Sequence, residues 1–566
     1  MKPRSFHWSR PAGLGMAWLI AATCTTASVA KAADEDGMDD APAPQLQMTW
    51  KLGRDAQSQA ASAPAPESSA SQGAQPSADA QASLNNHVRG GDQLRSIPYE
   101  RTRFGSDPIY PADYATAAQW AIYGGKQKIE NSPRPLFEFG YPQYEAGPLP
   151  PARNWFGAKN LARPQFMVFG DWRTAVAAND AGGDRLGQLA TRLNLDFDLA
   201  LTSTGRLHWS MRPLDQDGRF TRYQFSDQKP GANNGFTSEL NGHLKTMFFE
   251  GDLSAITAGI TGRDQHWDLP FVVGFMPLFV QNGIWMNAAV TGGAFAIPAR
   301  SSPLFDISNM DITFFGAGGL VSSPAIRQAS GQLDQNAGQV FGVTMFAEML
   351  TGYLEAGYGY TNDTRHFAGG GDFSYHNLTL AFTRRYAGLI SNSVRLIGNF
   401  GQKPPPGAAH TADGYLVLVE NSFITRHELT LVPYLNLWYG QHHPQSLLRA
   451  ADAGGVLANT GINFQTDGLT GFPNLDASAQ DTYGGALGIE YLFSLDRQVV
   501  AEVSGVFPHG DDSAKRPAQG DQYAVGLRFQ QNLGKAWILR SDYTYGIRGG
   551  GQPDFNGVRL EIRRKF

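Results

Sequence analysis

The sequence contains very little cysteine and no excess of positive charge. One cysteine, Cys24, occurs in 566 residues, which excludes a framework of disulfides within the chain. The 46 basic residues are outnumbered by 51 acidic ones, and the formal net charge is −5. Nucleic acid is therefore not expected as a partner, because binding it requires a positive field that displaces phosphate counterions.

Long apolar runs are also absent beyond the N-terminus. Only 17% of the residues are charged and 42% are apolar or aromatic, yet no run of about 18 uncharged apolar residues is available for a spanning helix. This excludes a helical membrane protein. The remaining classes are a soluble β-rich protein and a membrane protein whose apolar surface is built from alternating strands.

The common catalytic and cofactor motifs are missing as well. The chain has no Gly-x-Ser-x-Gly, no phosphate-binding loop and no His-Glu-x-x-His. We therefore expect neither an enzyme nor a bound cofactor or metal. His442 and His443 are adjacent, and in an extended loop they point to opposite sides, so a shared metal site is not expected. Asp196, His208 and Ser210 form a hydrolase triad on paper only, since any polar barrel interior offers such combinations.

The N-terminus predicts export. Residues 1–32 resemble a secretory signal peptide, with basic residues such as Lys2 and Arg10, a short apolar core over 14–22, and small residues at Ala30 and Ala32 before the cleavage point. The mature chain then has no cysteine, as suits an oxidising compartment.

Two segments of unusual composition follow the signal peptide. Residues 33–95 are rich in Ala, Ser, Pro and Gln, and such a composition buries too little apolar surface to fold, which predicts a disordered periplasmic tether. Residues 96–160 are rich in Pro, Arg and aromatics and are interpreted as a lead-in, plug or cap. One hypothesis for the role of the tether is that it binds a periplasmic partner.

From residue 161 to 566 the dominant pattern has a period of two, which is typical of strands with one apolar and one polar face. In residues 191–201 the apolar face is Leu193, Leu195, Phe197, Leu199 and Leu201, and the polar face is Arg192, Asn194, Asp196 and Asp198. The last strand alternates in the same way and ends at Phe566. A soluble sandwich buries the apolar face, whereas a transmembrane barrel turns it to lipid.

The barrel is favoured by aromatics near the strand ends and by alternating short turns and long polar loops. We predict an all-β fold, a transmembrane antiparallel β-barrel of about 16–18 strands, since about 400 residues remain at roughly 22–25 per strand.

The alternation, the exported cysteine-free chain and the terminal Phe566 together resemble the Gram-negative outer-membrane porin-like barrel family. The resemblance implies an outer-membrane location, contact with lipid and lipopolysaccharide, and recognition of the last strand, including Phe566, by the barrel-insertion machinery. Two residues depart from the family pattern: Arg564 stands where an apolar residue is usual, and Glu561 stands where Gly is common.

The polar faces supply the candidate pore-lining residues. Opposed rows of Arg and Asp would orient dipolar solutes in a pore, but cross-strand Arg–Asp pairs also simply hold barrel walls together, and the sequence favours neither role. The candidates are Arg192, Asp196, Asp198, Arg206, His208, Arg212, Arg385, Arg395, Arg528, Arg540 and Asp542.

Two further segments bear on the size of the bore. The segment from Leu269 to Trp285 is apolar on both faces and carries Pro270 and Pro277, which predicts an element folded into the lumen. The long loop from Gln441 to Asp481 is expected to be extracellular.

Together the barrel, its polar inner face and these segments predict a channel for passive or facilitated diffusion of small hydrophilic solutes. The alternative is a sheath or export channel for a partner, such as an electron-transfer cytochrome or a secreted polysaccharide.

Overall fold

The computed structural model describes residues 134–140, 151–182, 185–216, 218–227, 234–328, 332–423, 431–465, 468–494, 496–510, 516–534 and 536–566. The expectations for the signal peptide (1–32) and the tether (33–95) lie outside these residues. Most of the lead-in (96–160) also lies outside them.

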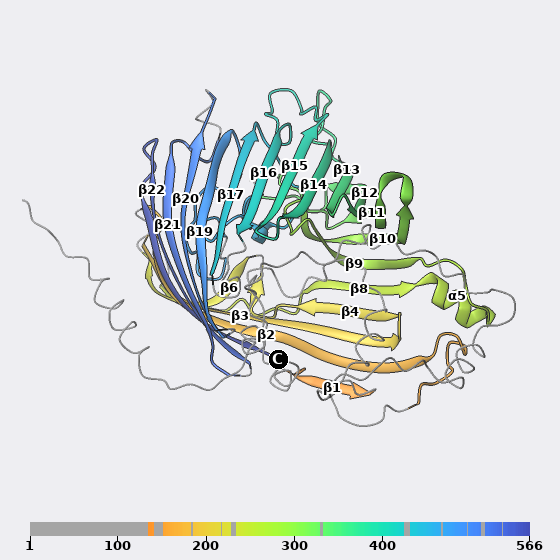
Figure 1. Ribbon diagram of the computed structural model, residues 1–566. Helices are drawn as coiled ribbons and strands as arrows, with labels where there is room; N and C mark the ends of the chain where they lie inside the picture. The colour runs from red at the N-terminus through yellow and green to blue at the C-terminus, as the bar shows by residue number, and fades with distance from the viewer. Residues whose placement is uncertain are drawn as a thin grey trace, which may run out of the picture.

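The described residues form one large sheet that closes on itself, and its wall strands pair antiparallel (Figure 1). Its strands are β1 (Phe137–Gly140), β2 (Ala162–Asp180), β3 (Arg185–Thr202), β4 (Arg206–Met211), β5 (Asp215–Gln216), β6 (Arg219–Asp227), β7 (Gly235–Thr237), β8 (Leu244–Asp252), β9 (Pro270–Val280), β10 (Met286–Ser302), β11 (Ile307–Gly319), β12 (Gly338–Met349), β13 (Gly352–Asp363), β14 (Tyr375–Tyr386), β15 (Ile390–Phe400), β16 (Tyr415–Phe423), β17 (Leu431–Gln441), β18 (Leu448–Arg449), β19 (Thr482–Ser494), β20 (Arg497–Pro508), β21 (Gln522–Asn532), β22 (Trp537–Arg548) and β23 (Phe555–Lys565).

The wall of the described barrel has eighteen strand positions. β4 and β6 both pair with β3 and share one position, and β7 and β8 continue the next one. The circle closes where β23 pairs with β2, from Asp171 opposite Lys565 to Asp180 opposite Asn556. The predicted barrel and its strand number are therefore confirmed.

β2 is longer than β23 and runs on past the C-terminus. β1, from the lead-in, pairs with this extension of β2, and Phe566 exchanges two backbone hydrogen bonds with Gly170 at the junction. Figure 1 shows the C-terminus beside β2 and β1. A side chain at Gly170 would collide with the Phe566 ring and with the backbone of β3, so the glycine makes room for the terminal aromatic.

The two faces of the wall differ as the alternation predicts. Exposed Leu, Val, Ile and Tyr side chains cover the outside, such as Leu378, Leu380 and Val525, while the residues between them are buried. An apolar belt around a closed sheet is what a lipid environment requires, because no strand edge is left unpaired in hydrocarbon. This arrangement is that of an outer-membrane barrel.

The two ends of the barrel are also unlike. Strand pairs at one end are joined by short connections, such as Leu350 and Thr351, which adopt the positive φ angles of a tight hairpin turn. Long segments join strands at the other end, the longest being residues 442–481 between β17 and β19. Short turns are periplasmic and long loops extracellular in outer-membrane barrels, so the C-terminus lies at the periplasmic rim.

Residues 442–481 do not extend away from the barrel but fold into it. Their Val456, Leu457, Phe464 and Leu475 share a buried cluster with wall residues such as Trp438. We refer to residues 442–481 as the inserted loop. It contains β18, which pairs with β10, and the short 3-10 helix η3 (Ala451–Ala453).

The prediction that the segment from Leu269 to Trp285 folds into the lumen is wrong for most of its length. Residues 270–280 are β9, a wall strand between β8 and β10. Pro270 is its first residue, and β8 pairs with β9 only as far as Phe275, so Pro277 needs no donor on that side. Only the turn after β9 reaches inward: the buried Trp285 donates from Nε1 to Asn377 Oδ1 of β14 at 2.7 Å.

A short helix and a 3-10 turn complete the described elements. α5 (Leu253–Thr261) joins β8 to β9 at the periplasmic end, capped by Asp252, whose carboxylate accepts from the Ser254 N–H at 2.7 Å. η2 (Pro303–Phe305) joins β10 to β11. No helix in the described part of the chain is long and apolar enough to cross a bilayer.

Candidate functional site

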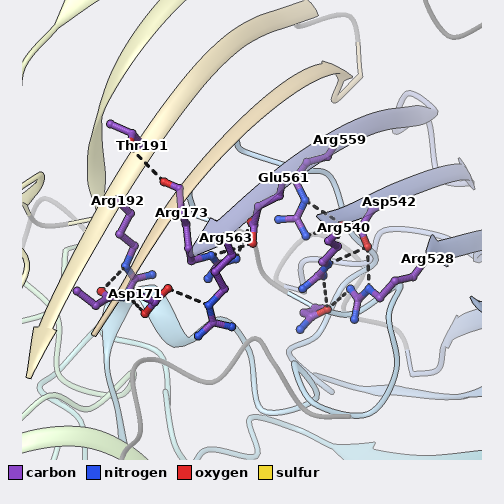
Figure 2. A network of polar contacts seen from close by, with 12 residues as sticks. Asp171, Arg173, Thr191, Arg192, Arg528, Arg540, Asp542, Arg559, Glu561 and Arg563 are labelled. Atoms are coloured by element: carbon purple, nitrogen blue, oxygen red, sulfur yellow. Dashed lines mark hydrogen bonds and ion pairs between the residues drawn. The ribbon is translucent and has the colours of Figure 1, made fainter. Parts of the chain in front are cut away.

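The inner face of β21, β22 and β23 gathers three arginines around one carboxylate (Figure 2). Asp542 Oδ1 accepts from Arg528 Nε at 2.7 Å, and Asp542 Oδ2 accepts from Arg540 Nε at 2.9 Å and from Arg559 Nη2 at 2.6 Å. Gln465 of the inserted loop accepts from Arg528 and Arg540 as well. The cluster thus carries an excess of positive charge, and we call it the Asp542 cluster.

A second set of ion pairs joins the last strand to the first. Arg173 of β2 makes a bidentate pair with Glu561 of β23, at 3.0 and 2.8 Å, with both side chains buried. Arg563 Nε donates to Asp171 Oδ2 at 2.9 Å. Figure 2 shows both pairs between the ribbons of the two strands. Glu561, one of the two residues that depart from the porin-like pattern, therefore forms an ion pair with Arg173 across the two strands that close the barrel.

The network continues onto β3. Asn194 Nδ2 donates to Asp171 Oδ1 at 2.8 Å, and Asn194 Oδ1 accepts from Arg192 Nε at 3.0 Å. Arg212 donates to Asp452 of the inserted loop at 3.1 Å. Burial by itself raises the pKa of Asp452, but the charges of Arg212 and Arg192 outweigh it and lower that pKa below the ordinary value.

The periplasmic half of the inner face holds a mixed group. Arg206 donates to Asp198 at 3.2 Å, and His208 Nε2 lies 3.1 Å from Glu250. Ser210 pairs with Thr246 at 2.6 Å, not with His208. Ser210 and His208, which resembled part of a hydrolase triad on paper, therefore contact other residues. Asp196 is held on the same face of β3, next to this group.

The remaining candidates lie on other strands. Arg395 of β15 is buried and donates to Glu420 of β16 at 2.9 Å, whereas Arg385 lies near the periplasmic end of β14 and is exposed. The candidate pore-lining residues fall on the polar side of their strands, as the alternation requires. Their role in conduction remains a prediction.

The inserted loop is fastened to the inward turn after β9. Arg449, fully buried, donates to the carbonyl oxygens of Gly283 at 2.7 Å and Ala453 at 2.9 Å, and it has no carboxylate among its described contacts. Burial lowers the pKa of Arg449 to about 10. The loop backbone also pairs with the turn, since Leu447 N–H donates to Trp285 O at 2.9 Å.

The far side of the inserted loop is held by a buried carboxylate of β20. Glu502 accepts from the N–H groups of Ile462 and Asn463, at 2.8 and 3.0 Å, and from the Tyr434 hydroxyl at 2.5 Å. The loop is therefore attached to opposite parts of the wall and divides the interior. Strand alternation predicts that Glu502 lies on the inner face. It does not predict that Glu502 binds the backbone of a loop forty residues away, because no sequence pattern marks that contact.

Histidines lie where the inserted loop leaves the wall. His443 Nδ1 and Asp413 Oδ1 are 2.8 Å apart, and the His442 N–H donates to Asp481 Oδ1 at 2.7 Å. Burial raises the pKa of Asp413, but the hydrogen bond and charge of His443 and the charges of His410 and His442 outweigh it, so that the net pKa is lowered. The adjacent histidines have different carboxylate neighbours.

No family model and no curated protein sequence matches this chain. Its described fold is similar to several solved outer-membrane proteins. OccK11 (OpdR) of Pseudomonas aeruginosa is 9% identical with a TM-score of 0.43, and the match covers 71% of this chain and 96% of that one. OccK1 (OpdK) of the same organism is 12% identical with a TM-score of 0.44, and OccAB4 of Acinetobacter baumannii is 12% identical with a TM-score of 0.43, each covering 71% of this chain and 98% of the other.

The described chain is a closed β-barrel with the architecture of outer-membrane barrels. This statement rests on its own strand pairing, on the closure of β2 against β23 and on the apolar outer belt.

Proposed function

We propose that the barrel is an outer-membrane channel for passive or facilitated diffusion of small hydrophilic solutes. The observation that carries this proposal is the inner wall, where ion-paired Arg, Asp and Glu side chains follow one another from β21 to β3. Charged side chains on the face opposite the lipid favour a polar lumen that admits hydrophilic solutes.

The inserted loop supports small solutes over a threaded partner. It is bound to the turn after β9 on one side and to Glu502 on the other, so it occupies part of the cross-section. A cytochrome sheath or a polymer export channel needs an unobstructed bore and would require the loop to leave these contacts. The sheath is therefore the weaker of the two hypotheses.

Conductance in planar bilayers tests the proposal. The full chain should form discrete single-channel steps. Replacement of residues 456–477 by a short Gly-Ser linker should enlarge those steps, because the loop narrows the lumen. A control variant, Lys159→Gln, removes a charge from an exposed ion pair with Asp264 and should leave the steps unchanged. A folded barrel that shows no conductance would refute the proposal.

A further inference from the structure

An arginine lies on the lipid-facing side of the wall at the seam where the barrel closes. Arg564 of β23 stands directly opposite Trp537 of β22 and Trp172 of β2. On the same strand Ile562 is exposed and Glu561 is buried, so alternation places Arg564 on the outer face. Both indoles are exposed, at 49% for Trp172 and 39% for Trp537. The result is a row of Trp, Arg and Trp across three neighbouring strands.

The row is held in place by its own contacts. The Arg564 guanidinium lies 5.5 Å from the centre of the Trp537 ring, and Trp172 Nε1 donates to Thr191 Oγ1 at 2.7 Å. The neighbouring Arg559 and Arg563 point inward and are paired with Asp542 and Asp171. Arg564 has no carboxylate among its described contacts, since Asp171, Asp542 and Glu561 lie on the other face and Asp180 lies at the far end of β2. Its N–H donors are therefore available to a partner outside the chain.

Two more arginines at the periplasmic end repeat the arrangement. Arg384 lies 5.3 Å from the ring centre of Tyr386 at the end of β14, and Arg153 lies 5.1 Å from that of Trp155. Neither has a carboxylate among its described contacts.

Other described arginines that lie over aromatic rings are occupied. Arg365, which lies over Phe367, is paired with Asp363, and Arg548, which lies over Phe555, donates to the Asn474 carbonyl. The unoccupied pairs of an arginine and an aromatic thus gather at the rim with the short turns.

We propose that the row of Trp172, Arg564 and Trp537 binds the phosphate of an anionic phospholipid in the periplasmic leaflet. Indoles settle at the level of the headgroups, and an arginine on the lipid face costs little free energy there and reaches outward to water. The planar guanidinium matches a phosphate oxygen pair, and the flanking indole keeps it on the outer face. This site does not depend on whether the barrel conducts.

Binding of purified full-length protein to two lipids tests the proposal. Phosphatidylglycerol and phosphatidylcholine, each in mixed micelles, are titrated while the retained lipid is counted by native mass spectrometry. We expect phosphatidylglycerol to be retained preferentially, with the preference reduced about tenfold in Arg564→Gln. Arg564→Lys should keep part of it, because the charge stays while the planar fork is lost. The control Arg185→Gln removes an arginine at the opposite rim and should keep all of it.

Three outcomes would overturn the proposal. Equal retention by wild type and Arg564→Gln would show that the arginine is not the binding group. Competition by inorganic phosphate as strong as that by the lipid would assign the site to free anions. A loss of outer-membrane insertion in cells with unchanged lipid preference would assign Arg564 to assembly. If Arg564→Gln does not fold, quenching of wild-type tryptophan emission by brominated phosphatidylglycerol must exceed that by brominated phosphatidylcholine.

Discussion

Replacing Asp542 by asparagine should destabilise the barrel strongly, although the two side chains have the same size. Three guanidinium groups converge on this carboxylate, with N–O distances of 2.7, 2.9 and 2.6 Å, and the carboxylate is buried. Removal of one partner from a buried ion pair costs about 3–5 kcal/mol, since the remaining charges stay desolvated. The equilibrium constant for folding should therefore fall by about two to four orders of magnitude.

Urea unfolding of the protein in lipid vesicles, followed by tryptophan emission, measures the change. The control Asp264→Asn removes a carboxylate from an exposed ion pair with Lys159 and should have little effect. The double variant Asp542→Asn with Arg540→Gln should recover part of the loss, because one unpaired cation is removed. A loss of less than about 1 kcal/mol, typical of a surface pair, would contradict the assignment of this cluster as a desolvated network.

Four further predictions follow from the same structure. Leu380→Arg, on the exposed outer face in the middle of β14, should abolish most insertion, since a mid-bilayer arginine costs about 2–4 kcal/mol, whereas Leu350→Arg in a periplasmic turn should not; equal yields in a vesicle-folding assay would contradict the outer-face assignment. Deletion of Phe566 should lower outer-membrane levels in cells but leave the conductance of refolded protein unchanged; normal levels in cells would contradict it. Removal of residues 34–95 should preserve heat-modifiable migration on gels, and its loss would show that the segment stabilises the barrel. Asp413→Asn should destabilise the protein above about pH 4. The pKa of Asp413 is lowered in the folded protein, so its ionised form contributes stability that is lost as the pH falls through that lowered pKa. A difference in stability between variant and wild type that does not change with pH would argue against the contact with His443.

Local alternation was enough to predict the barrel and the polarity of its wall. A strand turns successive side chains to opposite faces, so Leu193 and Leu195 had to share one face and Arg192 and Asn194 the other, whatever the strand pairs with. The same argument places Glu561 and Arg564 on opposite faces of the last strand. These assignments need no knowledge of distant residues.

The consequences of those faces were less predictable. Alternation suggests that a polar side chain such as Asn194 meets water, yet it is 3% exposed and bonded to Asp171 and Arg192. Both ends of its amide are occupied, by Asp171 of β2 and by Arg192 of its own strand. A substitution at Asn194 is therefore expected to be costly, which the pattern of the strand alone does not reveal.

Only the tertiary structure decided which segments cross the interior. It also decided which arginines, such as Arg564, have no carboxylate beside them in the described part of the chain. The apolar segment from Leu269 to Trp285 looked like an insertion, but its prolines lie where β9 starts and where β8 no longer pairs with it. The polar loop of residues 442–481 crosses the interior instead, because Arg449 and Glu502 bond to backbone groups far away in the sequence. Alternation fixes the direction of a side chain, since direction is local; partners depend on closure and register, which set the neighbours of each strand only when the whole sheet is assembled.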